Sequence, residues 1–460
     1  MAKTIFLIVP NQVFISDLLR TKYIEYLSQK YRLVVFTPFI SEETAVKENY
    51  FKSPNVIYEK WDLTNPRFWN LFKTLRVSLV NEFDYLKSIK YWYQRPNYLE
   101  NRKRRLLRFL GKPLAKILTA NFFTRLEYLL LPRAPKFLDY CKRYQPLLML
   151  TSTPGFNPLE AEFIILAKRA GLPTIAVNAT FDNMTMNVKH IRKTDYFIAW
   201  NRIIKQEAIN IHKFREERVF VSGTPRFDPY FTDIDAAPTA VGASLARFFG
   251  GREPSREEFL RFKGLNPKYK TIFHTTVTKA YPFQKKYIRD LIKLRGSNQI
   301  PYVNLFIRIH PLDIYENYAD FFGVPDCCIE KATQSPDREI EMTYADLLNL
   351  KYSLKYTDLN INYASTISIE ACIFDKPIIN IGYLDRFALA YDFDHYRPIV
   401  EAHAVRVAKT DEELTRFINM YLKNPALDRE GRKKIVVDYV GYTDGLAYQR
   451  SVDFLEQCFL

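Results

Sequence analysis

The chain has 460 residues, of which 47% are hydrophobic, and a formal net charge of +16 at pH 7. This hydrophobic content excludes a disordered chain, and the length predicts two domains because single cores rarely exceed about 250–300 residues. No apolar run approaches the roughly 18 residues that cross a bilayer, and the first run is too short for a signal peptide. The five cysteines show no metal or disulfide spacing. We therefore expect a reduced, cytoplasmic protein.

Strand patterns alternate with helical patterns through the first half of the chain, which is typical of βαβ units with a parallel sheet. The expected strands are 5–10, 32–37, 55–59, 147–152, 173–178, 196–200 and 218–222, and the expected helices include 11–28, 158–169 and 202–212. Residues 66–145 are helical, aromatic and basic without a strand pattern. We interpret them as a helical insertion in the first domain.

The second half repeats this alternation after a turn-rich segment at 223–228. The expected strands are 271–274, 303–309, 359–363 and 377–381, and the expected helices are 282–295, 411–422 and 436–460. We expect a first domain at 1–228, a second domain at 229–440, and a terminal helix at 441–460 that could cross back onto the first domain.

The stretch 359–382 combines two buried strand patterns with a short polar turn and a helix between them. Ser365 and Thr366 open the helix, where free N–H groups and the positive end of the helix dipole favour a phosphate, and Ser368 adds a further hydroxyl. Glu370, one turn further along, could accept hydrogen bonds from a ribose diol. The stretch therefore suits the phosphate and ribose of a nucleotide. The alternative is that Ser365 or Thr366 only caps the helix.

Four motifs resemble those of GT-B nucleotide-dependent transferases, and they fall in the order that this fold requires. Residues 308–311 (Arg-Ile-His-Pro) are similar to the His-Pro motif of bacterial sialyltransferases, Kdo transferases and CDP-glycerol glycerophosphotransferases, and 364–370 resembles their Ser-Thr motif. Residues 223–228 resemble the segment that ends the first domain of glycerophosphotransferase-like proteins. Residues 181–185 and 199–201 resemble a pattern of surface-polysaccharide proteins of the same superfamily.

This resemblance implies an α/β protein with two facing Rossmann-like domains, parallel sheets and an interdomain cleft. In those families the His contacts the donor phosphate or a carboxylate-bearing sugar, and the Ser-Thr motif cradles donor phosphates. In other GT-B enzymes the helix Glu holds the nucleotide ribose. Carried onto this chain, these roles fall on His310, Ser365, Thr366 and Glu370.

Further donor contacts are expected beside the His-Pro motif. Arg308 lies two residues before His310, hence on the same strand face, and could add positive charge. Thr275 and Thr276 end the first strand of the second domain, where their hydroxyls could meet the donor diphosphate, and Lys279 could neutralise charge nearby. The alternatives are a structural strand-end histidine and an ordinary turn of Thr residues. No residue spacing suggests a metal, so we expect no cofactor and no obligatory metal.

Two residues are candidates for the catalytic base. The acidic motif of many sialyltransferases and the first-domain His-Gly-Thr segment of glycerophosphotransferases are both absent. Asp182 follows an expected strand in a short polar loop and could take the proton of an acceptor hydroxyl, unless it only forms an Asx-turn. Asp17, after the first strand, is the competing base, with a solvated helix face as its alternative.

Positive charge is concentrated at 87–116, where ten Lys and Arg residues accompany a single acidic residue and several aromatic side chains. An anionic membrane surface is the favoured partner, because no nucleic-acid motif accompanies the stretch. Nucleic acid is the second alternative, and a solvated helical face without a partner is the third.

The sequence therefore predicts a cytoplasmic glycosyltransferase at the membrane surface, which moves a sugar from a nucleotide-activated donor to a hydroxyl of a surface glycan or lipid-linked acceptor. The alternatives are CDP-glycerol-dependent transfer of glycerol phosphate, a nucleotide-sugar epimerase, and an inactive nucleotide-binding relative of the same fold.

Overall fold

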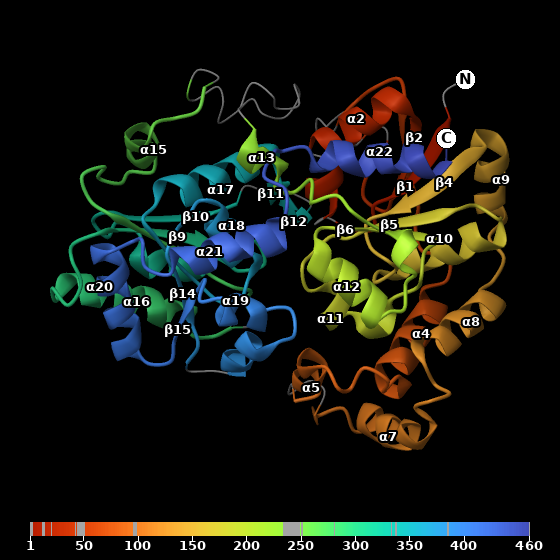
Figure 1. Ribbon diagram of the computed structural model, residues 1–460, viewed down its shortest axis with the longest axis horizontal. Helices are drawn as coiled ribbons and strands as arrows, with labels where there is room; N and C mark the ends of the chain where they lie inside the picture. Colours follow the sequence, from red (N-terminus) through yellow and green to blue (C-terminus); the bar gives the residue numbers. More distant parts are fainter. Residues whose placement is uncertain are drawn as a thin grey trace. The chain divides into compact units, whose positions relative to one another are not determined.

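The computed structural model describes residues 3–11, 14–19, 21–41, 43, 51–94, 99–232, 249, 252–279, 281–332, 334–335, 338–383 and 386–459. The chain divides into two compact units (Figure 1). Unit 1 comprises Met1–Pro225 and Leu446–Leu460, and unit 2 comprises Arg226–Gly445. The boundary expected at 228 lies close to this division, and the end of the chain belongs to unit 1.

Unit 1 is built on a sheet of seven parallel strands in the order β3-β2-β1-β4-β5-β6-β7. The strands are β1 (Thr4–Ile8), β2 (Arg32–Thr37), β3 (Val56–Lys60), β4 (Pro146–Thr151), β5 (Thr174–Val177), β6 (Tyr196–Ala199) and β7 (Val219–Val221). All seven expected strands are confirmed, with ends that shift by one or two residues.

Helices cover both faces of this sheet, so its central strands are apolar on both sides. In β1, Ile5 and Leu7 face one core while Phe6 and Ile8 face the other. The first core includes side chains of α2 (Lys22–Lys30) and of the terminal helix α22 (Ala447–Phe459), which lie side by side (Figure 1). The other helices of unit 1 outside the insertion are η1 (Ile15–Leu19), α10 (Pro158–Arg169), α11 (Asn183–Met186), η3 (Val188–His190), α12 (Arg202–Asn210) and η4 (Glu216–Arg218).

The expected helical insertion is present between β3 and β4. It consists of α4 (Pro66–Leu79), α5 (Lys87–Trp92), α7 (Arg102–Gly111), η2 (Lys112–Leu114), α8 (Ala120–Leu130) and α9 (Pro135–Tyr144). Asn65, Asn101 and Thr119 begin α4, α7 and α8, and each side chain accepts a hydrogen bond from a backbone N–H of the first turn. Residues 95–98 of the basic stretch lie outside the described residues.

Unit 2 contains a six-stranded parallel sheet in the order β10-β9-β8-β13-β14-β15. Its strands are β8 (Thr271–Thr275), β9 (Asn304–Ile309), β10 (Cys327–Lys331), β13 (Leu359–Asn362), β14 (Ile378–Ile381) and β15 (Arg406–Ala408), with a hairpin of β11 (Gln334–Ser335) and β12 (Arg338–Met342) beside them. The four expected strands are confirmed. The edge strands β10 and β15 and the hairpin were not predicted.

The helices of unit 2 lie before, between and after its strands. They are α13 (Asp228–Phe231), α15 (Arg256–Phe262), α16 (Gln284–Gly296), η6 (Tyr315–Phe321), α17 (Tyr344–Tyr356), α18 (Thr366–Ile373), η7 (Arg386–Asp392), α19 (Arg397–Glu401), α20 (Asp411–Lys423), α21 (Arg429–Ile435) and η8 (Val436–Val440). Within the described residues of both units, no helix combines the length and hydropathy needed to span a bilayer.

Candidate functional site

Three adjacent strands of unit 2 end at the same edge of the sheet and carry most of the expected donor residues. β9, β8 and β13 are neighbours, and they lead into His310, Thr276 and Ser365 respectively. The loops after β8 and β9 are joined directly, because the backbone N–H of His310 donates to Thr276 Oγ1 at 2.9 Å and that of Thr276 donates to the Arg308 carbonyl at 3.0 Å. The carboxyl edge of a parallel sheet is where ligands of such folds bind.

The ring of His310 is fixed in one tautomer by its own loop. The backbone N–H of Leu312 donates to His310 Nδ1 at 3.0 Å. Burial lowers the pKa of His310 below its usual value, although the charge of Asp313 opposes this shift. The imidazole is therefore neutral at neutral pH, and with Nδ1 accepting, its proton is on Nε2. His310 thus offers an N–H donor to an anion.

Asp313 is held in place by the same loops. Its Oδ2 accepts hydrogen bonds from Gln284 Nε2 at 2.8 Å and from Tyr318 Oη at 2.6 Å. Gln284 in turn accepts from the backbone N–H of Val277. These bonds connect the β8 loop, the first turn of α16 and the His-Pro loop, so His310 has a rigid support.

Ser365 and Thr366 begin α18 as expected. Ser365 is the N-cap, and its Oγ accepts from the backbone N–H of Ile367 at 3.4 Å. Both side chains are half-buried. Capping is thus a role that the structure gives to Ser365, and a ligand contact for either hydroxyl stays a prediction.

Ser368 lies within a buried polar network. Its hydroxyl donates to Asn362 Oδ1 at 3.0 Å and pairs with Tyr396 Oη at 2.7 Å, while Asn380 Nδ2 lies 3.3 Å away. The residue has no exposed surface. Ser368 was expected among the phosphate contacts, but the structure gives its hydroxyl the role of positioning α18 on β13 and β14.

Glu370 is also fully buried, and one of its oxygens already has a partner. Glu370 Oε2 accepts from Tyr230 Oη at 2.7 Å, and burial together with this carboxylate raises the pKa of Tyr230 well above its usual value. Arg226 Nε lies 3.5 Å from Oε1. Glu370 Oε1 itself has no hydrogen-bond partner among the described residues. This remaining acceptor fits an additional donor, such as a hydroxyl of a bound ribose.

Arg308 was expected to add positive charge to the donor site, but it is paired within the chain. Arg308 Nη1 donates to Glu330 Oε1 at 2.6 Å, and Glu330 also binds Lys263 at 2.5 Å and Asn349 Nδ2 at 2.9 Å. Arg308 Nη2 is buried without a hydrogen-bond partner among the described residues. Glu330 neutralises much of the charge of Arg308, and it lies on β10, which the sequence did not predict.

The remaining donor candidates lie at the end of β8. Thr275 is buried as the last residue of the strand, whereas Lys279 is exposed in the following turn. The buried His274 hydrogen-bonds through Nδ1 to the Ile361 carbonyl at 3.1 Å, and burial lowers its pKa to about 4. His274 therefore joins β8 to β13 as a neutral side chain.

The two base candidates follow strands of unit 1. Asp182 Oδ1 accepts from Thr180 Oγ1 at 2.5 Å, and Asn183 Oδ1 accepts from the Thr180 backbone N–H at 3.0 Å. This is the local turn that was weighed as the alternative. Asp17 is 7% exposed on the π-helical turn η1 after β1. Both lie at the carboxyl edge of the unit 1 sheet.

A third carboxyl group at that edge was missed. Glu160 is fully buried after β4, where its carboxyl group accepts from Ser152 Oγ at 2.8 Å, from the Thr153 backbone N–H at 2.7 Å and from Thr153 Oγ1. Burial raises the pKa of Glu160 to about 7. The signal was in the sequence, because 151–153 (Thr-Ser-Thr) is a run of hydroxyl side chains between a strand and the helix α10, which begins at Pro158. Its bonds make Glu160 a support for this loop.

Within the described residues, no group of three or more His, Cys, Asp and Glu side chains is gathered as a metal site. The expectation that no metal is required stays a prediction, because no contact here tests it.

No protein-family model matches the chain, and no curated protein matches it in sequence. Solved structures match it over nearly its whole length. MnaA from S. aureus in complex with UDP is 13% identical with a TM-score of 0.56, and the match covers 99% of this chain and 96% of that one. The UDP-GlcNAc 2-epimerase of Neisseria meningitidis, bound to UDP-GlcNAc, is 11% identical with a TM-score of 0.56, covering 99% and 100% of the two chains.

A variant of the wall teichoic acid polymerase TagF is similar in the same way, at 13% identity and a TM-score of 0.52, with 100% of this chain and 89% of that one covered. At such low identity these matches show the fold alone. The two parallel sheets of seven and six strands agree with it. The chain therefore has the GT-B fold of two Rossmann-like domains.

Proposed function

We propose that the protein is a glycosyltransferase that moves a sugar from a nucleotide-activated donor to a hydroxyl of a cell-surface glycan or a lipid-linked acceptor. The observation that carries the proposal is the arrangement of His310. Its Nε2–H donor stands at the carboxyl edge of the unit 2 sheet, hydrogen-bonded through its backbone to Thr276 and fixed in tautomer by Leu312. A fixed neutral donor suits a diphosphate whose negative charge grows as the sugar leaves.

The rest of the donor site follows from the ends of the neighbouring strands. The N-terminus of α18, with Ser365 and Thr366, suits the diphosphate because its first-turn N–H groups and dipole favour an anion. Glu370 Oε1, buried without a hydrogen-bond partner among the described residues, suits a ribose hydroxyl. Thr275, Thr276 and Lys279 add hydroxyl and ammonium donors. No divalent metal is assigned to the reaction.

The acceptor and the base are assigned to unit 1. An inverting transfer needs a carboxylate that takes the proton of the acceptor hydroxyl as the donor bond breaks. Asp182 is the first candidate because its side chain is half-buried, and among the described residues its carboxylate bonds only to its own turn. Asp17 is the second.

The second candidate function is epimerisation of a nucleotide sugar, and fold similarity favours it. The epimerase from Neisseria meningitidis matches over 100% of its own length, so the similarity of fold extends over the whole of that enzyme. TagF similarly keeps CDP-glycerol-dependent transfer as an alternative donor chemistry. An epimerase converts its nucleotide sugar without an acceptor, whereas a transferase releases the nucleotide, so product analysis separates the two.

The first experiment is a thermal-shift measurement with CMP, CDP, UDP, GDP and dTDP on the wild type and on His310→Asn. One nucleotide is expected to stabilise the wild type, because a ligand at about 100 times its dissociation constant adds about 2.7 kcal/mol to the free energy of unfolding. His310→Asn is expected to show a smaller shift, since Asn keeps an acceptor near the position of Nδ1 for Leu312 but lacks the Nε2–H donor.

His403→Asn is the matched control. His403 is exposed in unit 2 with a backbone φ of 56°, which Asn tolerates well, so this variant changes the same side chain outside the site. Its thermal shift should equal that of the wild type. If no nucleotide stabilises the wild type, the donor-site assignment fails and an inactive member of the fold becomes the better description.

An anionic membrane surface is the proposed location of the acceptor. On α7, Leu106, Phe109 and Leu110 are 59%, 70% and 57% exposed, and the same helix carries five Lys and Arg side chains. Exposed apolar side chains beside cations are typical of helices that lie in a lipid interface.

Replacing both Phe109 and Leu110 with Ser is expected to reduce co-sedimentation with phosphatidylglycerol vesicles at least fivefold, because the burial of two large apolar side chains is lost. The control is the same double change at Leu129 and Leu130 on α8, which are 72% and 60% exposed. Equal binding by the wild type and both double variants would contradict a membrane role for α7. Binding of the wild type to neutral phosphatidylcholine vesicles as strong as to phosphatidylglycerol vesicles would contradict the anionic surface.

A further inference from the structure

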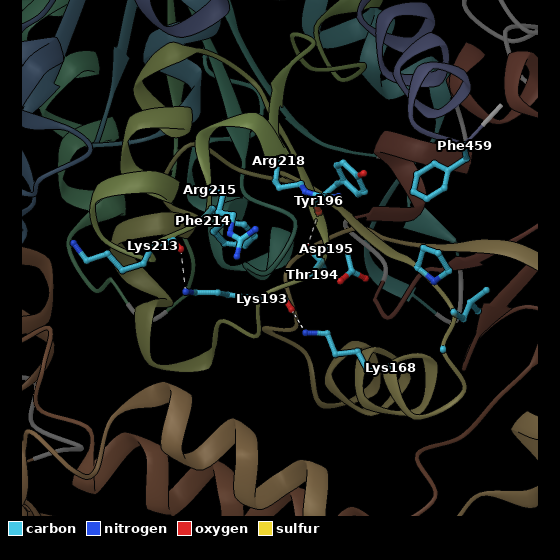
Figure 2. A pocket seen from close by; sticks show the side chains of 13 residues that line it. Lys168, Lys193, Thr194, Asp195, Tyr196, Lys213, Phe214, Arg215, Arg218 and Phe459 are labelled. Carbon is cyan, nitrogen blue, oxygen red and sulfur yellow. Dashed lines mark hydrogen bonds between the residues drawn. The ribbon is translucent and has the colours of Figure 1, made fainter.

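A cavity of about 690 Å³ lies in unit 1 (Figure 2). Its lining includes Pro173, which precedes β5, Tyr196, which begins β6, and Arg218, which precedes β7. It therefore opens at the amino-terminal ends of these parallel strands. A cavity of this volume is in the range of small-molecule sites, which are about 300–1,000 Å³.

The lining is strongly basic. Five cationic side chains surround the cavity with one carboxylate, Asp195; the cations are Lys168, Lys193, Lys213, Arg215 and Arg218. Figure 2 shows them arriving from the end of α10, from the loop before β6 and from the segment between α12 and β7. Asp195 is already engaged, because its Oδ2 accepts from the backbone N–H and the hydroxyl of Thr174, each at 2.8 Å.

Among the described residues, the three lysines are held by carbonyl oxygens and not by carboxylates. Lys168 Nζ donates to the Lys193 carbonyl, Lys193 Nζ to the Lys213 carbonyl at 3.0 Å, and Lys213 Nζ to the Asn210 carbonyl at 2.6 Å. These bonds position the ammonium groups without neutralising them. Burial lowers the pKa of Lys168 and of Lys193, and in each case the charge of the neighbouring lysine lowers it further, although Asp195 opposes the shift of Lys168 and Glu82 that of Lys193. The cavity therefore holds positive charge at an electrostatic cost.

Favourable interactions with helix dipoles explain the positions of only some of these cationic residues. Lys168 lies in the last turn of α10 and Lys213 just after α12, where cations stabilise the negative ends of helices. Lys193, Arg215 and Arg218 do not lie in the last turn of a long helix. Arg215 is exposed, and its side chain makes no hydrogen bond or ion pair with the described residues, so its guanidinium is available to a ligand.

Aromatic side chains form the rest of the wall. Phe214 is buried, Phe459 comes from α22, and Tyr196 has the guanidinium of Arg218 over its ring at 4.4 Å. A flat ring or a sugar can pack on such surfaces while phosphate oxygens meet the cations, and arginine is well suited to bind phosphate through two parallel N–H donors.

We propose that this cavity is a second ligand site, which binds a phosphate-bearing molecule of about the size of a nucleoside diphosphate. It is separate from the donor site proposed in unit 2, and no part of that proposal is needed for it. The two sites lie in different units of the chain.

The test is calorimetric titration with pyrophosphate in the His310→Asn background, which weakens the donor site of unit 2. A single site is expected, and Arg215→Glu should weaken its affinity at least tenfold. Arg218→Gln should weaken it less, and its melting temperature shows whether loss of the contact with Tyr196 alters the fold. Arg133→Glu, an exposed residue of unit 1 outside the cavity, is the control for net charge and should bind as its parent does.

The proposal is overturned if pyrophosphate does not bind in this background, or if Arg133→Glu weakens binding as much as Arg215→Glu does. Parallel titrations with UDP and inorganic phosphate identify the ligand class. Tighter binding of UDP than of pyrophosphate indicates a nucleotide held by the aromatic wall, and equal binding indicates recognition of the phosphates alone. Failure of the donor site appears separately, as nucleotide shifts that His310→Asn does not change.

Discussion

His310→Asn is expected to lower the rate of nucleotide release from the donor by about 10²- to 10³-fold, which is the usual loss when one fixed donor to a developing anion is removed. The variant isolates one atom. Asn keeps an acceptor for the Leu312 backbone N–H, which in the wild type bonds to His310 Nδ1 at 3.0 Å, and it removes only the Nε2–H donor. The rate is measured with the nucleotide sugar whose base is selected by the thermal-shift panel.

The companion variant is His310→Gln, whose amide N–H reaches closer to the position of Nε2. It should recover part of the lost rate, while the KM for the donor should change less than kcat in both variants because the bond is strongest in the transition state. A rate for His310→Asn within about threefold of the wild type would mean that His310 does not contact the leaving group. The melting temperature without ligand should be close to that of the wild type, so a loss of folding would not be mistaken for the effect.

The architecture could be predicted from the sequence because buried parallel strands have short, continuous runs of apolar residues. The alternating sides of β1, with Ile5 in one core and Phe6 in the other, require an apolar residue at every position. The edge strand β10 (Cys327–Lys331) has no such run, since it is only half-buried and carries Glu330 and Lys331. β15 has only three residues, too few for a pattern.

Site residues could be predicted where their position at the end of a strand determines their role. They were harder to predict where the role depends on a partner far away in the sequence. His310, Thr276 and Ser365 could be placed together because parallel strands end at one edge of the sheet. The pairing of Arg308 with Glu330 joins residues on two strands, and that of Glu370 with Tyr230 spans 140 positions. No local pattern reports such a partner.

The role of the Ser368 hydroxyl also depends on partners that a local sequence pattern does not show. A serine in the first turn of a helix that follows a strand is typical of phosphate sites, so the sequence pattern alone suggested a ligand contact. Only the positions of Asn362 and Tyr396 show that this hydroxyl is turned into the core. The sequence pattern predicted the helix, and the packing around the helix determines which of its hydroxyl groups can contact a ligand.

Glu127→Gln is expected to reduce the free energy of unfolding of unit 1 by about 3–5 kcal/mol, because removing one partner of a buried ion pair leaves uncompensated charge. Glu127 on α8 binds two arginines. Its Oε1 accepts from Arg76 Nε and Arg192 Nη2, each at 2.7 Å, and its Oε2 accepts from Arg76 Nη2 and Arg192 Nε, each at 2.9 Å. The side chains of Arg76 and Glu127 have no exposed surface, and that of Arg192 is 4% exposed.

This cluster attaches the helical insertion to the sheet, since Arg76 lies on α4, Glu127 on α8 and Arg192 in the loop before β6. Burial alone would raise the pKa of Glu127, but the charges of Arg192 and Arg76 outweigh burial and lower it. The carboxylate therefore stabilises the fold at pH values above 4.5, its usual pKa. As the pH falls through the lowered pKa the wild type loses this stabilisation, so the difference between wild type and variant should shrink.

Hydrogen exchange is the suitable measurement, because the protein has two units and a single unfolding transition cannot be assumed. Amides of β5 and β6 should lose protection in Glu127→Gln by a factor that corresponds to the loss of stability, while amides of β8 and β9 in unit 2 keep theirs. The control is Glu216→Gln, which removes a 72% exposed partner of Lys205 at 3.5 Å and should cost about 0.5 kcal/mol or less. A similar loss in both variants, or no loss in Glu127→Gln, would show that the cluster does not stabilise unit 1.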